Sequence, residues 1–135
     1  MLAAIPLMII PFVLYNLAML GLFGQGGIPA LDGEIFALSM LSGARWTLSL
    51  GDLFILISLL LLFFEIIKSA WRGNSALINH MLSMLVFIAF LVEFLLVRDA
   101  ATHIFFILMV VAFIDVISGF TISIKAANRD VSIGL

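Results

Sequence analysis

The sequence predicts an all-α integral membrane protein, a four-helix transmembrane bundle with a short interfacial helix between the first and second spans. The first observation is the composition, since 65% of the 135 residues are hydrophobic and only 10% are charged. Soluble domains are about 45–50% apolar and about 25% charged, so lipid must solvate much of this chain. The second observation is a series of apolar stretches of about 20 residues, the length that crosses a bilayer as a helix.

These stretches predict a single membrane domain over residues 1–135, with spans at about 2–23, 46–67, 76–97 and 102–124. The first stretch contains no charged residue and no basic leader precedes it, so we expect a retained helix rather than a signal peptide. Pro6 lies near the first turn of this helix, where proline is tolerated. Pro11 is expected to kink the helix, because its ring replaces a backbone donor.

The connections between the spans differ in length. Short polar links around residues 71–75 and 98–101 make the helices that they join antiparallel neighbours. The link over residues 24–45 is longer, and Asp32 in it is expected to cap a helix that is too short to span. This interfacial helix would lie at the membrane surface and carry a series of apolar side chains, namely Ile35, Phe36, Leu38, Met40 and Leu41.

Positive charges predict the orientation of the bundle. With four spans, both termini lie on the side that holds Lys68, Arg72, Lys125 and Arg129, and the opposite side holds Arg45 and Arg98. The positive-inside rule therefore predicts cytoplasmic termini. The same charge bias, together with the lack of an organelle presequence, favours a multi-pass protein of a bacterial inner membrane.

Four carboxylates lie within or at the edge of the predicted spans. A charge in hydrocarbon costs several kcal/mol, so such a residue faces protein or water and usually has a partner or a function. At about 1.5 Å per helical residue, Glu65 and Asp115 both lie roughly 20 Å below the outer ends of their helices. Asp52 and Glu93 share a level near the outer ends. The sequence thus predicts one polar layer near each membrane face.

The acids of the inner layer differ in their neighbours. Lys68 and Arg72 follow Glu65 on the same helix face, which predicts an ion pair within the helix. Asp115 has no basic residue within one turn, so its partner is Lys68 or Arg72 from another helix, or it is protonated. Gly119, one turn further on, predicts that this face of the fourth helix packs closely against protein.

The outer acids have simpler interpretations. Glu93 is within reach of water or of Arg98, which follows it by five residues. Asp52 follows Gly51 and is interpreted as a first-turn acid, a position that the helix dipole favours.

The two histidines are candidate haem or quinone contacts. His80 lies near the inner end of the third predicted span and His103 near the outer end of the fourth, so one haem cannot take both within one subunit. Hydrogen bonding at the membrane interface is the favoured role for each.

Several functions are excluded or disfavoured. The chain has no cysteine, which excludes disulfides, thiolate metal sites and cysteine nucleophiles. The net charge of -2 gives no indication of a nucleic-acid partner. Phosphate-loop and dinucleotide patterns are absent, and loops this short leave no room for a catalytic domain. No enzyme activity, cofactor or metal site is predicted.

The favoured function is a small non-catalytic membrane protein, an accessory, scaffold or assembly subunit of a larger membrane complex or a homo-oligomer. Its partners would be the lipid bilayer and other membrane subunits or further copies of itself. One alternative is a proton- or cation-coupled small transporter that uses Asp115 and Glu65. A second alternative is a quinone-, lipid- or haem-binding protein, with a pocket formed by the kinked first helix and the interfacial segment.

Overall fold

The computed structural model describes residues 5–23, 26–70 and 76–133, except for the side chains of 76–77, 122–123 and 125–133. The chain is mostly helical. Its four α-helices are α1 (Ile9–Met19), α2 (Leu50–Ala70), α3 (Ala76–Leu96) and α4 (His103–Ile133). Three segments are long and apolar enough to cross a membrane, Leu50–Ala70, Ile78–Leu96 and His103–Thr121. The chain is therefore a multi-pass membrane protein by the length and composition of its helices.

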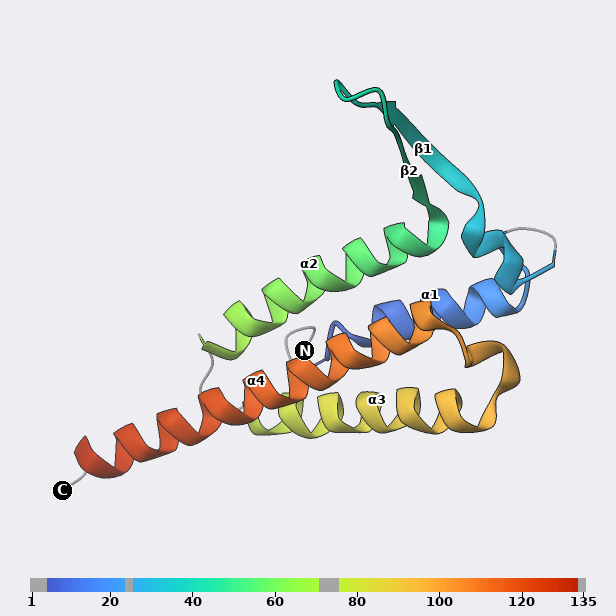
Figure 1. Cartoon of the computed structure of the whole chain (residues 1–135). Helices are drawn as coiled ribbons and strands as arrows, with labels where there is room; N and C mark the ends of the chain where they lie inside the picture. The colour runs from blue at the N-terminus through green and yellow to red at the C-terminus, as the bar shows by residue number, and fades with distance from the viewer. Residues whose placement is uncertain (1–4, 24–25, 71–75, 134–135) are drawn as a thin grey trace.

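Helix α4 lies at the centre of the arrangement. It packs against α2 on one side and α3 on the other, and α1 lies beside the half of the molecule where α4 begins (Figure 1). A short 3-10 helix, η3 (Arg98–Ala100), joins α3 to α4 and makes them antiparallel. Helix α4 has 31 residues. At 1.5 Å per residue it is about 46 Å long, and its C-terminal part extends beyond the ends of α2 and α3 (Figure 1).

The first helix is shorter than the sequence predicts. Helix α1 has 11 residues, and at 1.5 Å per residue it covers about 16 Å of a hydrocarbon core that is about 30 Å thick. Pro11 falls in its first turn, where a missing backbone donor costs little, so the predicted kink at Pro11 is wrong. Residues 6–8 form turns instead, in which Pro6 and Leu7 carbonyls accept the N–H groups of Ile9 and Ile10. A four-span bundle is thus not confirmed.

The predicted interfacial helix is also wrong. Asp32 ends a short 3-10 helix, η2 (Ile28–Asp32), and the chain then forms an antiparallel hairpin of β1 (Glu34–Ser39) and β2 (Arg45–Ser49). Gly43 closes the hairpin at a φ of +93°, a backbone conformation that favours glycine. The Met40 N–H donates to the Ala44 carbonyl at 2.8 Å, which completes the turn. The hairpin extends sideways from the start of α2 rather than along the helices (Figure 1).

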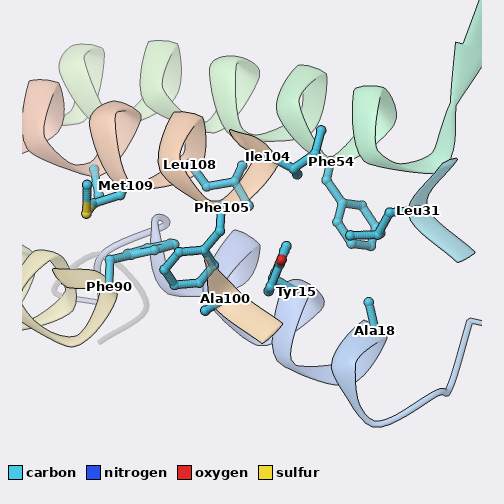
Figure 2. Packing of buried hydrophobic residues seen from close by; sticks show 11 residues of the cluster. Tyr15, Ala18, Leu31, Phe54, Phe90, Ala100, Ile104, Phe105, Leu108 and Met109 are labelled. Atoms are coloured by element: carbon cyan, nitrogen blue, oxygen red, sulfur yellow. The ribbon is translucent and has the colours of Figure 1, made fainter. Parts of the chain in front are cut away.

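The main buried cluster lies at the hairpin end of the molecule. Its aromatic members come from four different elements, with Tyr15, Phe54, Phe90 and Phe105 almost fully buried. The Tyr15 ring meets the Phe105 ring edge to face at 4.8 Å, and Phe90 packs on Phe105 at 5.2 Å (Figure 2). Such pairs add about 0.5–1.5 kcal/mol beyond area burial. This cluster fixes α1 against α3 and α4, while the outward faces of the long helices stay apolar and exposed to lipid.

Candidate functional site

Buried polar side chains lie on the faces by which α2 and α3 pack on either side of α4. Each comes from the inward face of its helix, and the buried set within the described residues is Ser58, Glu65, Asn79, Ser83 and Asp115. A polar layer of this kind inside apolar helices requires partners for every donor and acceptor. Glu65 and Asp115, which the sequence places at one level, are both part of it.

Glu65 is completely buried and binds both its own helix and the N-terminal segment. Its Oε1 accepts a hydrogen bond from the Lys68 ammonium at 2.8 Å and one from the Leu7 backbone N–H at 2.9 Å. The Lys68 Nζ also donates to the Ile5 carbonyl at 2.9 Å. The ion pair that the i, i+3 spacing predicts is therefore present, and it also holds the turn that precedes α1.

This arrangement solves a problem that Pro6 and Pro11 create. A non-helical backbone at membrane depth is tolerated only where protein satisfies its polar groups. Residues 5–8 are not helical, and the Glu65 carboxylate and the Lys68 ammonium satisfy one donor and one acceptor of that segment. The pair works as a clamp on the N-terminal segment, a role that the sequence did not predict.

Asp115 lies on the face of α4 that points toward this clamp. It is 4% exposed, the Ser83 hydroxyl of α3 lies within hydrogen-bonding reach, and the charges of Glu65 and Lys68 both act on it. Its Oδ2 is buried and has no hydrogen-bond partner among the described residues. The Oε2 of Glu65 is also buried and has no hydrogen-bond partner among the described residues. Two facing helices thus bring two unpartnered carboxylate oxygens into one buried layer.

His80 of α3 contacts α4 at Gly119, which lies one helical turn beyond Asp115. Its ring packs on Phe120 at a centroid distance of 5.6 Å. A Cβ at Gly119 would lie 3.1 Å from the His80 Nδ1, so the glycine makes room for the imidazole. The Nδ1 atom is buried and has no partner in the described part of the chain.

The outer acids are arranged differently. Asp52 and Ser49 form a reciprocal cap at the start of α2, in which the Ser49 N–H donates to the Asp52 carboxylate and the Asp52 N–H donates to the Ser49 hydroxyl, both at 3.1 Å. Glu93 is half-buried on α3, and the Asn16 amide of α1 lies within hydrogen-bonding reach of it. Arg98, the predicted partner of Glu93, is exposed in η3, and no ion pair joins the two.

Tyr15 is a polar contact that sequence reasoning missed. Its hydroxyl donates to the Asp99 carbonyl at 2.9 Å and lies 2.7 Å from the Thr102 hydroxyl. It thereby joins α1 to the α3–α4 connection. It is the single tyrosine of the chain, and its place among apolar residues was the available signal.

The histidines do not form one site. His103 is exposed at the start of α4, and His80 contacts α4 at Gly119, sixteen residues further on, which is about 24 Å along the helix. Within the described residues, no group of three or more His, Cys, Asp or Glu side chains is placed to hold a metal. Arg72, the other predicted partner of the inner acids, lies outside the described residues.

An apolar groove of about 340 Å³ opens between α1 and α3. Its walls are side chains from the turn before α1, from α1 itself and from the middle of α3, namely Ile5, Pro6, Ile9, Phe12, Leu82, Leu85, Val86 and Ala89. All of these side chains are apolar, so the groove suits an acyl chain and offers no polar side chain to a quinone head group.

Comparison of the chain with protein-family models, with curated proteins and with solved structures found no match.

Proposed function

We propose that this chain is a non-catalytic membrane subunit that assembles with a second copy of itself through the hairpin of residues 34–49. The membrane would be a bacterial inner membrane, with the hairpin outside and the C-terminal end of α4 in the cytoplasm. The observation that carries the proposal is a strand pair that leaves one strongly apolar face uncovered at the end of the membrane domain.

The two faces of the hairpin differ in chemistry. Cross-strand partners point to the same side of a hairpin, and the register pairs Phe36 with Leu48 and Leu38 with Trp46. These four side chains form the apolar face. The opposite face carries small or polar side chains, which are Ala37, Ser39, Arg45 and Thr47.

The apolar face has no cover within the described residues. Phe36, Leu38 and Trp46 are each close to half exposed, and Leu41 at the turn is fully exposed. A two-stranded hairpin is marginally stable by itself, and burial of a large apolar side chain is worth about 1.5–3 kcal/mol. A second apolar surface would therefore stabilise the hairpin substantially.

The direction of the hairpin favours a neighbour in the same membrane. Because the hairpin extends sideways from the helices, a second copy with the same orientation can reach it (Figure 1). A two-fold axis along the membrane normal keeps both copies in one topology and packs the apolar face against its own equivalent. The lipid-facing surfaces of α2 and α3 need not take part.

Cysteine cross-linking tests this proposal directly, since the chain has no cysteine of its own. We expect Leu38→Cys, on the apolar face, to form a disulfide-linked dimer in native membranes under mild oxidation. Ala37→Cys is the matched control, because it lies on the same strand and points to the opposite face. It is expected to stay monomeric on the same gel.

A second experiment tests the role of the apolar face in assembly. The double variant Phe36→Ser/Trp46→Ser should convert a dimer mass in lipid nanodiscs to a monomer mass, whereas Ala37→Ser/Thr47→Ser should leave the dimer intact. The proposal would be overturned if the wild type were a monomer and brominated lipid quenched the fluorescence of Trp46. That result would place the apolar face against the bilayer. A stable complex with a different chain in place of the dimer would overturn it as well.

A further inference from the structure

We propose that Glu65 and Asp115 share one exchangeable proton between α2 and α4, which makes this pair a proton-binding site inside the membrane domain. The inference goes beyond assembly through the hairpin and does not depend on it. It rests on the geometry of the buried polar layer.

The two carboxylates are buried and each has one oxygen without a partner. Glu65 is 0% exposed and Asp115 is 4% exposed, and the unpartnered atoms are Oε2 of the first and Oδ2 of the second. An unsatisfied charged oxygen in such surroundings is costly. One proton held between two carboxylates supplies a donor to one oxygen and a charge-assisted hydrogen bond to the other.

The charges in this layer also favour one additional positive charge. From α2, Glu65 and Lys68 act on Asp115, and from α3 the Ser83 hydroxyl lies within hydrogen-bonding reach of it. His80 of α3 lies against Gly119, one helical turn further along α4. The segment before α1 contributes only backbone groups to the clamp. With both acids ionised and Lys68 protonated, these described side chains carry one net negative charge, which one proton neutralises.

The carboxylate oxygens of Glu65 and Asp115 fit a proton better than a metal ion. The Lys68 ammonium already lies 2.8 Å from Glu65 Oε1 and would repel a second cation. Calcium takes six to eight oxygen ligands and magnesium about six. The described residues at this point offer far fewer oxygens, and no third acid joins the pair.

His80 gives the proton a neighbour with which to exchange. Its Nδ1 is buried, unpartnered and next to Gly119, one helical turn from Asp115 toward the C-terminal end of α4. The nitrogens of an imidazole can donate or accept a hydrogen bond, so the ring can pass on a proton. We therefore infer that the proton reaches the carboxylate pair from the side of the molecule where α2 ends.

Infrared spectroscopy of the purified full-length protein in lipid tests the site. We expect the wild type at neutral pH to show the C=O stretch of a protonated carboxylic acid, shifted by D₂O, and Asp115→Asn to lose this band. Asp99→Asn, which changes an exposed acid, should retain it. Absence of the band in the wild type, or its persistence in both Asp115→Asn and Glu65→Gln, would overturn the proposal.

Two milder variants keep the test decisive if Asp115→Asn does not fold. Ser83→Ala removes a hydroxyl within reach of Asp115 and should shift the frequency of the band without abolishing it. His80→Phe keeps an aromatic ring against Phe120 and should slow hydrogen–deuterium exchange of the band. A band unchanged in frequency in Ser83→Ala and unchanged in exchange rate in His80→Phe would count against the shared proton.

Discussion

At the scale of single residues, the decisive feature is that a few polar side chains each join separate parts of the chain. Lys68 satisfies the Glu65 carboxylate and the Ile5 carbonyl at once. The Tyr15 hydroxyl joins two backbone segments that are 84 residues apart in sequence. In surroundings where water is scarce, each such contact controls where one element sits against another.

The Glu65–Lys68 pair gives the first prediction. Lys68→Met leaves Glu65 buried beside Asp115 without a counter-charge, and we expect a loss of about 3–5 kcal/mol of unfolding free energy. The double variant Lys68→Met/Glu65→Gln should recover part of this loss, because no unpaired charge remains in the clamp. Denaturant unfolding in mixed micelles measures both. Equal losses in the single and double variants would contradict this role of the pair.

Tyr15 gives the second prediction. Tyr15→Phe keeps the ring packing on Phe105 and removes the hydroxyl, which should lower the unfolding free energy by about 1–3 kcal/mol. Thr102→Val removes one partner of the hydroxyl. Because the two groups interact, the double variant should lose less than the sum of the single losses, as a thermodynamic cycle from thermal melts will show.

At the scale of elements, the hairpin shows how a local pattern was misread. Arg45, Trp46, Thr47, Leu48 and Ser49 alternate strictly between polar and apolar, which is the signature of a strand with one apolar face. On β1 the register shifts between Glu34 and Phe36, so this strand contains one extra residue. The adjacent apolar residues Ile35 and Phe36 therefore interrupt the alternation of polar and apolar side chains. The run of apolar residues then resembled one side of a short helix.

Gly43 provides a prediction about this element. Its φ of +93° is unfavourable for other residues, while a Cβ there would meet no atom within 4 Å. Gly43→Val should therefore destabilise the hairpin by about 1–2 kcal/mol through the backbone alone, and Gly43→Asn should cost less. Limited proteolysis of the turn in nanodiscs reports the difference. Equal resistance of the valine variant and the wild type would contradict the turn geometry.

The packing of α3 on α4 depends on a small residue in the same way. Gly119→Leu places a side chain where the His80 ring lies, so we expect a loss of about 1–3 kcal/mol of unfolding free energy. Adding His80→Ala should restore part of this stability by making room. The thermal midpoints of the three variants provide the measurement. No rescue in the double variant would show that the leucine disturbs something other than His80.

At the scale of the whole molecule, the long helices and their connections follow the sequence closely. The predicted spans at 76–97 and 102–124 correspond to α3 and most of α4, and the span at 46–67 corresponds to α2 except that residues 46–49 form part of β2. The agreement follows because a run of about 20 apolar residues has one stable conformation in lipid. The prediction for residues 2–23 was less successful. The two prolines limit where α1 begins, and Gly21 follows its end at a φ of +85°, so α1 has only 11 residues. Before it, Glu65 and Lys68 each supply one hydrogen bond to the backbone of Leu7 and Ile5.

The orientation of the molecule is the last prediction. Arg45 and Arg98 lie at the hairpin end, and Lys68 lies toward the opposite end, where α2 finishes (Figure 1). Arg72 follows α2 in the sequence, and Lys125 and Arg129 belong to the last part of α4, so four basic residues stand against two. The positive-inside rule therefore predicts that the hairpin lies outside the cell membrane. In intact cells we expect a membrane-impermeant maleimide to label Ser42→Cys and to label Ser132→Cys only after lysis. The reverse pattern would show the opposite orientation.

By itself the sequence determined that this is a helical membrane protein, and it located the three segments that are long and apolar enough to cross the bilayer. Those properties depend on composition, apolar length and a constant rise per residue, all of them local. Only the tertiary structure decided that Glu65 clamps the N-terminal segment, that Asp115 and Glu65 act on each other, and that the hairpin has one apolar face. These depend on which helix faces meet and on strand register, and no short stretch of sequence contains that information.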